Sequence, residues 1–382
     1  MQRSTDRILV THQGTLPRPD DVRAMMAARS QGEQYDTQAL GTLVRDSVIE
    51  AVRRQVEIGI DTVNDGELSK TSFSDYVSDR FGGIEPTPQP YVSPISGRDI
   101  REFPEYFASA GALGRAGGFR RVVYTCTGPL TYVGYGAVQT DIANFRAALQ
   151  GVEANEVYLP AVAPGSIEHW LKNAYYPSDE AFLYAIADAM HEEYRAIVDA
   201  GFLLQIDDPD LADGWQVHPD LDLSEYRKVA EMRTAALNHG LRDIPEDRVR
   251  LHMCWGSYHG PHKHDLPLEQ LVDIVLRARV GAYSIESSNP QHEHEWRVWE
   301  EAWLPDGKLL IPGVVGHFSD FVEHPRLVAD RIVRYARILG RENVIAGTDC
   351  GLGTRVGHAK ICWAKLEALV EGARLASQEL WG

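Results

Sequence analysis

The sequence predicts an α/β fold, a single (β/α)₈ barrel, and two observations lead to this prediction. First, an amphipathic helical segment, a terminal glycine and an apolar strand-like segment follow one another four times along the chain. Second, polar side chains collect where the strand-like segments end. Parallel strands joined by helices explain the first observation, and a barrel, in which the carboxyl ends of all strands meet on one face, explains the second.

The helix–glycine–strand unit is clearest after residue 37. Apolar residues at helical spacing run through 38–58 and stop at Gly59, and a strand-like segment follows at 60–67. A glycine directly after a helix is typical of a C-terminal cap. The other three helices that we expect to end in this way are 180–200, 268–280 and 325–339.

The sequence contains nine strand-like segments, one more than the eight strands of the barrel. They are 7–11, 60–67, 120–128, 157–165, 202–210, 248–256, 282–288, 309–317 and 341–350. Residues 82–118, rich in Pro, Gly and Tyr, are too long for an ordinary loop, so we expect a lid or a packing insertion between strands 2 and 3. An amphipathic segment at 359–381 is expected to be the last helix, and with no linker in sight we predict one domain spanning 1–382.

Composition restricts the partners. The chain has 382 residues, 44% of them apolar, which is enough for a large core. Its net charge of −17, with no basic block, argues against nucleic acid or a membrane surface as a partner. Four cysteines are too few for a disulfide framework, and we find no signal peptide or membrane span, so we expect a cytoplasmic protein. A homo-oligomer is left open.

A His-X-Cys pair within residues 251–257, LHMCWGS, is the first sign of a metal site. Residues two apart in a strand point to the same face, so His252 and Cys254 can present an imidazole and a thiolate side by side. Glu286 and Cys350, each at the end of a strand-like segment, would complete a tetrahedral set suited to Zn²⁺. Taken alone, the pair could instead be a core histidine and a buried thiol.

Eight segments, in the same order, resemble motifs of the catalytic barrel of the cobalamin-independent methionine synthase family. That barrel has no counterpart of 157–165, so the resemblance predicts that this segment is an insertion and not a barrel strand. The resemblance covers nearly the whole chain. Its segments are THQGTLPRP (11–19), VNDGE (63–67), CTGPLT (126–131), LLQIDDPDL (203–211), LHMCWGS (251–257), YSIESS (283–288), PGVVGH (312–317) and TDCGLGTR (348–355).

The resemblance implies roles for individual residues. It makes His252, Cys254, Glu286 and Cys350 the ligands of a zinc ion. It also implies that Glu67 and Asp207 hold the amino group of homocysteine and that Thr15 matches a nearby serine of the family. His317 lies close to the family's general acid, with one residue fewer between it and the PGV segment than in the family.

Three basic side chains and one carboxylate complete the predicted site. Arg18, Lys70 and Arg355, in the matching loops, are candidate anchors for an anionic or amino-acid substrate. Asp207 is counted with His317 among the catalytic residues. Two features depart from the family pattern: Asp208 stands where the family has Glu, and residues 257–265, SYHGPHKHD, are an insertion. We expect the insertion, with His259, His262 and His264, to be a solvated or substrate-contacting loop in preference to a metal site.

The predicted reaction is S-alkyl transfer, most simply methyl transfer, from an alkyl donor to a small thiol such as homocysteine. Zinc coordination deprotonates a thiol, and two Cys thiolates with one Glu make the site electron-rich, which suits attack on carbon better than activation of water. The identity of the donor stays open, because a chain of 382 residues lacks the second half of the full methionine synthase. Two alternatives remain: epoxide opening, as in the similar epoxyalkane coenzyme M transferase, and a zinc barrel that binds a thiol without turning it over.

Overall fold

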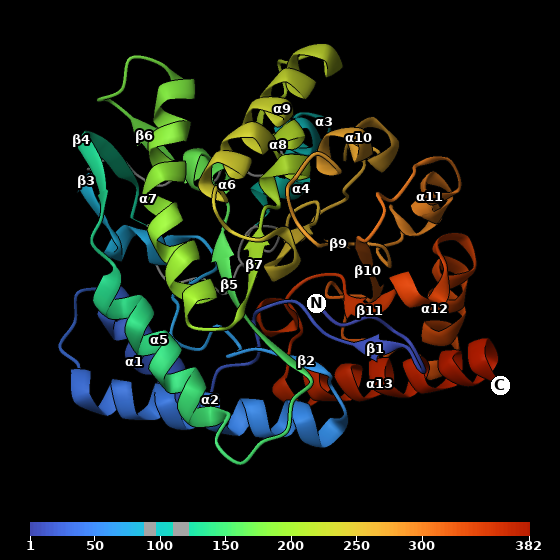
Figure 1. Ribbon diagram of the computed structural model, residues 1–382. Coiled ribbons are helices and arrows are strands. Elements are labelled where there is room, and N and C mark those ends of the chain that lie inside the picture. The colour runs from blue at the N-terminus through green and yellow to red at the C-terminus, as the bar shows by residue number, and fades with distance from the viewer. Residues whose placement is uncertain (88–96, 110–121) are drawn as a thin grey trace. The chain divides into compact units, whose positions relative to one another are not determined.

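The computed structural model describes residues 1–87, 97–109 and 122–382. Eight strands form one sheet in the order β1-β11-β10-β9-β8-β7-β5-β2, with helices between successive strands (Figure 1). A parallel bridge between Thr11 and Thr62 links the two ends of this order. The protein is therefore an α/β barrel, and the predicted fold class is confirmed.

The barrel strands are short, and most are buried along their whole length. They are β1 (Leu9–Val10), β2 (Thr62–Val63), β5 (Glu156–Val162), β7 (Leu203–Asp207), β8 (Val249–Met253), β9 (Ala282–Ile285), β10 (Leu309–Val315) and β11 (Ile345–Thr348). A separate three-stranded sheet has the order β3-β4-β6. Its strands are β3 (Phe81–Pro86), β4 (Tyr124–Tyr132) and β6 (Leu171–Asn173).

The helices vary from single turns to more than twenty residues. The α-helices are α1 (Asp20–Ser30), α2 (Thr37–Ile58), α3 (Gly97–Glu102), α4 (Pro104–Ala108), α5 (Tyr135–Ala148), α6 (Pro164–Trp170), α7 (Asp179–Asp199), α8 (Asp210–Val217), α9 (Leu223–Gly240), α10 (Val272–Val275), α11 (Val298–Glu301), α12 (Pro325–Leu339) and α13 (Ala359–Trp381). The 3₁₀ turns are η1 (Asp75–Asp79), η2 (Glu246–Arg248), η3 (Leu268–Gln270), η4 (Glu293–Arg297), η5 (Arg341–Asn343) and η6 (Leu352–Thr354). In the part of the chain that the structure describes, no helix has the length and apolar character needed to span a bilayer.

The chain divides into two compact units, and each is described by itself. Unit 1 comprises Met1–Ser69, Asp141–Pro160 and Gly281–Gly382. Unit 2 comprises Lys70–Thr140 and Ala161–Val280. The expectation of a single domain over 1–382 stays a prediction.

Unit 1 is built on β1, β9, β10 and β11, with α12 and α13 lying against each other (Figure 1). The two helices approach closely because Gly372 of α13 faces Val328 of α12, where a Cβ would lie 2.4 Å from Val328 Cγ1. One cluster of buried apolar side chains joins the four strands. It consists of Leu9, Ala282, Leu309, Ile311 and Ile345.

Unit 2 contains β7 and β8, the three-stranded sheet and the long helices α7 and α9. A buried carboxylate on α7, Glu193, connects the helix to the three-stranded sheet. It pairs with Arg80 at 2.9 Å and accepts hydrogen bonds from the hydroxyls of Tyr76 (2.8 Å) and Tyr132 (2.7 Å). Because every partner is itself buried, this network fixes the sheet against α7.

The assignment of the extra strand was wrong. Residues 157–165, predicted to be the insertion, supply barrel strand β5, whereas β4, which includes most of 120–128, lies in the three-stranded sheet. Burial explains the difference: the last five residues of β5 are all buried, as in a strand covered on both faces, but most of β4 alternates between exposed and partly buried positions. Residues 120–121 lie outside the described residues.

The helix predictions were mostly confirmed. α2, α7, α12 and α13 match the expected segments, and Gly59 (φ 96°) and Gly201 (φ 92°) have the left-handed conformation that favours glycine after a helix. The helix expected at 268–280 is wrong, because the chain forms only η3 and the single-turn α10 there. The predicted insertion 82–118 contains β3, α3 and α4, and its residues 88–96 and 110–118 lie outside the described residues.

Candidate active site

Three predicted site residues lie together in unit 2. His252 is on β8, Cys254 follows the end of β8, and both side chains are buried, at 3% and 2% exposure. β8 pairs in parallel with β7 so that His252 is opposite Asp207, the last residue of β7. The backbone nitrogen of Asp208 donates to the His252 carbonyl at 2.8 Å. The imidazole, the thiol and the Asp207 carboxylate therefore come from the carboxyl ends of two adjacent strands.

Buried polar side chains inside the strands hold Asp207. Gln205 Nε2 donates to Asp207 Oδ1 at 2.7 Å, and Arg250 Nε donates to Gln205 Oε1 at 2.7 Å. Neither Gln205 nor Arg250 was predicted. Their signal in the sequence is a long polar residue within an otherwise apolar strand, which must find a hydrogen-bond partner when it is buried.

Asp208, next along the chain, is a buried carboxyl with a strongly shifted pKa. Burial, reinforced by the negative charge of Asp210, raises the pKa of Asp208 to about 7. Ser166 Oγ donates to Asp208 Oδ1 at 3.3 Å and opposes the shift.

The other two predicted ligands lie in unit 1. Glu286 follows β9 and is 1% exposed, whereas Cys350 follows β11 and is partly exposed. Asp349 lies between β11 and Cys350 and binds the loop after Glu286. Its Oδ1 accepts from the backbone nitrogens of Ser287 (2.8 Å) and Ser288 (2.9 Å), and its Oδ2 accepts from Ser288 Oγ at 2.6 Å.

A candidate cation-binding group in unit 1 consists of Glu286, His317 and Asp349. Each offers one ligand atom, these atoms lie within 4.8 Å of one another, and all three residues are buried. Asn289 Nδ2 donates to Glu286 Oε1 at 3.1 Å. Burial raises the pKa of Asp349 to about 6, against the effect of its three hydrogen bonds. His317, predicted as the general acid, is thus placed beside a predicted ligand.

Three predicted substrate-binding residues also lie together in unit 1. Arg18 Nη2 donates to the backbone carbonyl of Glu67 at 2.9 Å. The Glu67 carboxylate lies over Gly14, where a Cβ would be 1.7 Å from Glu67 Oε1, and Thr15 lies against Gly351, where a Cβ would be 2.9 Å from the Thr15 nitrogen. Glycine at both positions therefore allows the Glu67 carboxylate to lie against residue 14 and Thr15 to lie against the segment that follows Cys350.

The backbone of Glu67 is itself unusual, with φ at 54°, a left-handed conformation that a non-glycine residue rarely adopts. Strained residues of this kind collect at functional sites, because the surrounding structure must hold them in place. Here Asp65 Oδ1 accepts from the Glu67 nitrogen at 3.0 Å. Burial lowers the pKa of Arg18, with Glu67 and Asp65 opposing. Arg355 follows η6 in the same unit and is partly buried.

The loop 257–265, expected to be solvated or to contact the substrate, is partly exposed and packs on α3. His262 is buried, its ring stacks on Tyr258 with centroids 4.0 Å apart, and its Nδ1 bonds to Asp265 at 2.7 Å. Tyr258 Oη donates to Asp99 Oδ2 on α3 at 2.9 Å, and His264 is paired with Glu102. Tyr258 and His264 thus connect the loop to α3, and in the described residues none of the three histidines belongs to a metal-binding group.

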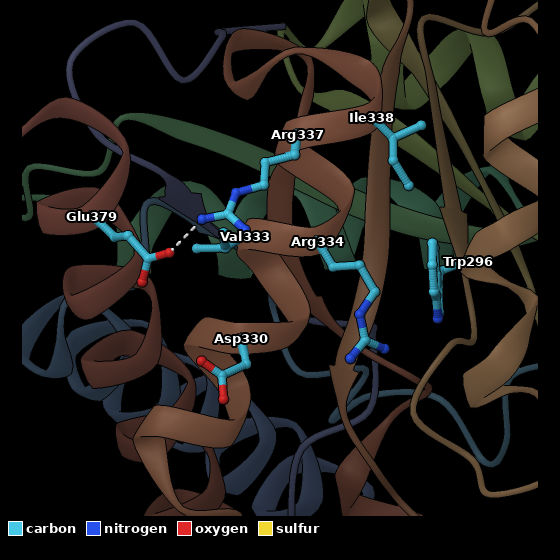
Figure 2. Close-up of a pocket in the computed structure, with 7 residues that line it drawn as sticks. All are labelled: Trp296, Asp330, Val333, Arg334, Arg337, Ile338 and Glu379. Atoms are coloured by element: carbon cyan, nitrogen blue, oxygen red, sulfur yellow. Dashed lines mark hydrogen bonds and ion pairs between the residues drawn. The ribbon is translucent and has the colours of Figure 1, made fainter.

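A cavity of about 490 Å³ lies between η4, α12 and α13 in unit 1 (Figure 2). Arg337 pairs with Glu379 across it at 2.9 Å, and Arg334 lies 5.1 Å from the Trp296 ring. Its seven lining residues include no predicted site residue. The cavity is therefore separate from the carboxyl-end site.

The fold and these side chains define a class of protein, an α/β barrel with thiol, imidazole and carboxylate groups at the carboxyl ends of its strands. Residues 171–375 match the model of one family, described as "Cobalamin-independent synthase, Catalytic domain". The match spans more than half of the chain, so the protein belongs to this family. The resemblance seen in the sequence is confirmed.

The relatives reported next share a quarter or less of their aligned residues with this chain. A 5-methyltetrahydropteroyltriglutamate–homocysteine methyltransferase of Thermotoga petrophila is 25% identical over 90% of the chain, and the chain spans only 41% of that relative. A methionine synthase of Thermococcus kodakarensis is 22% identical over 96% of the chain and 93% of its own length. A B12-independent methionine synthase from Shewanella sp. W3-18-1, solved with selenomethionine, has a TM-score of 0.76 at 18% identity, covers 98% of the chain and 99% of that structure, and supports the fold.

Proposed function

We propose that the protein is a thiol methyltransferase that binds its thiol at a metal ion. The observation that carries the proposal is the placement of two ligand pairs at the carboxyl ends of barrel strands. His252 and Cys254 form the buried pair of unit 2, and buried Glu286 with partly exposed Cys350 forms the pair of unit 1. Family membership adds a reaction class, since the relatives named above are methyltransferases or methionine synthases.

Zinc is the metal that fits these donors best. One imidazole nitrogen, two thiolates and one carboxylate oxygen form the four-coordinate N/S/O set that Zn²⁺ prefers, and hard cations such as Mg²⁺ would require more oxygen. When bound, the ion supplies a positive charge that keeps a coordinated thiol deprotonated at neutral pH. Glu286, the hardest of the four ligands, is the one that the incoming thiol is proposed to displace or loosen.

The protein's own side chains are proposed to bind and orient the substrates. Glu67, Asp207 and Thr15 would hold the amino group of an amino-acid thiol, and Arg18 and Arg355 would hold its carboxylate or another anionic group. Homocysteine is the proposed thiol, because the Thermotoga petrophila relative is named for it. Because the chain spans less than half of that relative, the relative's methyl donor is not carried over to this protein, and the proposal leaves the methyl donor open.

His317 and Asp207 are the proposed catalytic residues. The thiol loses one proton on binding and the departing group gains one, so the reaction needs side chains that hold and release protons close to the thiol. His317 meets this requirement with a ligand atom within 4.8 Å of Glu286 and Asp349. Asp207, fixed by Gln205 at 2.7 Å, can exchange a hydrogen bond with the substrate amino group as the thiol moves.

Two other functions fit the same residues. A thiolate held in this way could open an epoxide, as in epoxyalkane coenzyme M transferase, and a barrel with a slow or absent donor site could bind a thiol without reaction. Mass spectrometry of thiol products distinguishes the three. The assay would pair homocysteine or coenzyme M with 5-methyltetrahydropteroyltriglutamate, methylcobalamin or an epoxide.

The expected product is methionine from homocysteine and a methyl donor. A hydroxyalkyl thioether from coenzyme M would support epoxide opening. No product from any pair, with a thiol still bound, would support a binding protein.

A further inference from the structure

Glu323, in the loop after β10, bonds to the backbone next to the proposed catalytic residue His317. β10 ends at Val315, whose carbonyl accepts from the Asp349 nitrogen at 2.9 Å. The next backbone nitrogen, that of Gly316, donates to Glu323 Oε1 at 2.8 Å. His317 follows directly, so Glu323 holds the chain at the point where it leaves the barrel strand.

Lys365 of α13 binds the other oxygen of this carboxylate. Its Nζ lies 2.8 Å from Glu323 Oε2 and also donates to the Phe321 carbonyl. The Lys365 side chain is 0% exposed, and that of Glu323 is 11% exposed. Because the ammonium and the backbone amide are both donors, both oxygens of residue 323 must accept. A carboxylate meets this requirement, whereas a glutamine amide would place its NH₂ group against one of the two donors.

Gly316 also lies close to the groups that hold Glu286. A Cβ on Gly316 would be 3.5 Å from Ser288 Oγ and 3.7 Å from Asp349 Oδ2. The ligand atoms of His317, Glu286 and Asp349 lie within 4.8 Å of one another. A displacement of about 1 Å can lower the rate of a reaction about 100-fold, and 1 Å is a large part of this separation. The position of Gly316 therefore affects how His317 meets the site.

Stability alone does not account for the ion pair between Lys365 and Glu323. Burial takes both charges out of water, and apolar side chains of similar volume can often replace such a pair without loss of stability. An apolar pair would leave the Gly316 nitrogen without its acceptor. The contact that the ion pair supplies and an apolar pair cannot is thus the one beside His317.

We propose that Lys365 and Glu323 are positioning residues that fix His317 for proton transfer. Lys365 holds the Glu323 carboxylate and the loop backbone, Glu323 holds the Gly316 nitrogen, and Gly316 sets the backbone from which the His317 side chain extends. Neither Lys365 nor Glu323 touches a substrate, and both act through His317. The inference rests on the proposed function and adds to it how the proton-transfer residue is held.

A double-mutant cycle tests whether Glu323 acts through His317. The variants are Glu323→Gln, His317→Asn and the two combined. The assay is methionine formation from homocysteine with 5-methyltetrahydropteroyltriglutamate or methylcobalamin, whichever gives the higher wild-type rate. Glu323→Gln should lower kcat about tenfold or more and change KM for homocysteine less than about twofold. In the His317→Asn background the same change should lower kcat less than about twofold, because the group that it positions is gone.

A second variant separates positioning from stability. Lys365→Met combined with Glu323→Met replaces the ion pair by apolar side chains of similar volume, so the urea midpoint of unfolding should be at the wild-type value or higher. Its kcat should still fall about tenfold or more, because Gly316 has lost its acceptor. Wild-type kcat in this variant would overturn the inference. The variant also decides the question should Glu323→Gln fail to fold.

The matched control is Asp320→Asn, the same change from acid to amide in the same loop. Asp320 is exposed, and its Oδ1 accepts from the Gly357 nitrogen at 2.7 Å. The amide oxygen of Asn can keep this contact, and no second donor opposes its NH₂ group among the hydrogen bonds of the described residues. We expect wild-type kcat and KM in Asp320→Asn.

Equal kcat losses from Glu323→Gln in the wild-type and His317→Asn backgrounds would overturn the inference, as would wild-type kcat in Glu323→Gln. Wild-type kcat in His317→Asn would remove the role of His317 and this inference with it. Failure of the proposed function gives a different result, because the wild-type protein would then form methionine with neither donor.

Discussion

Asp349 binds the backbone of Ser287, the residue that follows Glu286, with its Oδ1 2.8 Å from the Ser287 nitrogen. Since Asp349 also precedes Cys350, one carboxylate connects the two proposed metal ligands of unit 1. The contact depends on Gly313 of β10, where a Cβ would lie 2.2 Å from Asp349 Oδ1. Three adjacent strands of the barrel, β9, β10 and β11, thus contribute to the position of one carboxylate.

Substitution of Asp349 should weaken metal binding without removing a ligand. Asp349→Asn keeps one acceptor for the backbone nitrogens but replaces the oxygen that accepts from Ser288 Oγ. Groups that orient metal ligands typically contribute 10–100-fold to affinity, so we expect a loss of about tenfold for Asn and more for Ala. Competition with a chromophoric zinc chelator measures the zinc affinity. Wild-type affinity in both variants would contradict the role of Asp349 in orienting the ligands.

The proposed ligand set predicts the metal content. Purified protein should hold about one zinc per chain, and Cys254→Ser or Cys350→Ser should each lose most of it, because a thiolate is replaced by a weaker neutral donor. Cys362→Ser is the control, since that thiol is buried in α13 and its pKa is raised to about 11 by burial. X-ray absorption should show two sulfur ligands, and a spectrum with one sulfur ligand or none would refute a site that takes a thiolate from each pair.

The sequence predicts the barrel well because its signal is repeated: helical periodicity, a glycine cap and an apolar strand recur at α2, α7 and α12. The sequence does not show that β5 and not β4 is the barrel strand. Both are apolar segments of similar length, and they differ only in whether one face or both faces of the strand are buried. Gln205 and Arg250 were missed for a related reason. Their importance lies in pairing with each other across β7 and β8, which no single segment reveals.

The close contact between Gly14 and the predicted substrate-binding residue Glu67 can be tested by substitution. A methyl group at this position would overlap Glu67 Oε1 at 1.7 Å, so Gly14→Ala should displace the Glu67 carboxylate. We expect KM for homocysteine to rise about tenfold or more, as for loss of one charge-assisted hydrogen bond, with zinc content unchanged. Gly41→Ala in α2 is the control, because a Cβ there meets nothing within 4 Å; equal KM in the two variants would contradict the role of Glu67.

The buried Glu193 network predicts how stability depends on pH. Burial acts to raise the pKa of Glu193, but Arg80, Lys70 and the two tyrosine hydroxyls outweigh it, so the pKa is lowered. A carboxyl with a lowered pKa stabilises the fold above its ordinary pKa of about 4.3, and this stabilisation is lost as the pH falls toward the folded-state value.

Glu193→Gln should therefore lower the free energy of unfolding at pH 7 by about 3 kcal/mol, because Arg80 loses its buried partner. It should also flatten the decline of stability below pH 4, since the group whose protonation opposes folding is gone. Denaturant unfolding from pH 3 to 7 measures both effects. Glu192→Gln, which affects only the exposed contact to Tyr135, should match wild type at every pH, and a parallel decline in all three proteins would show that Glu193 does not set the acid limit.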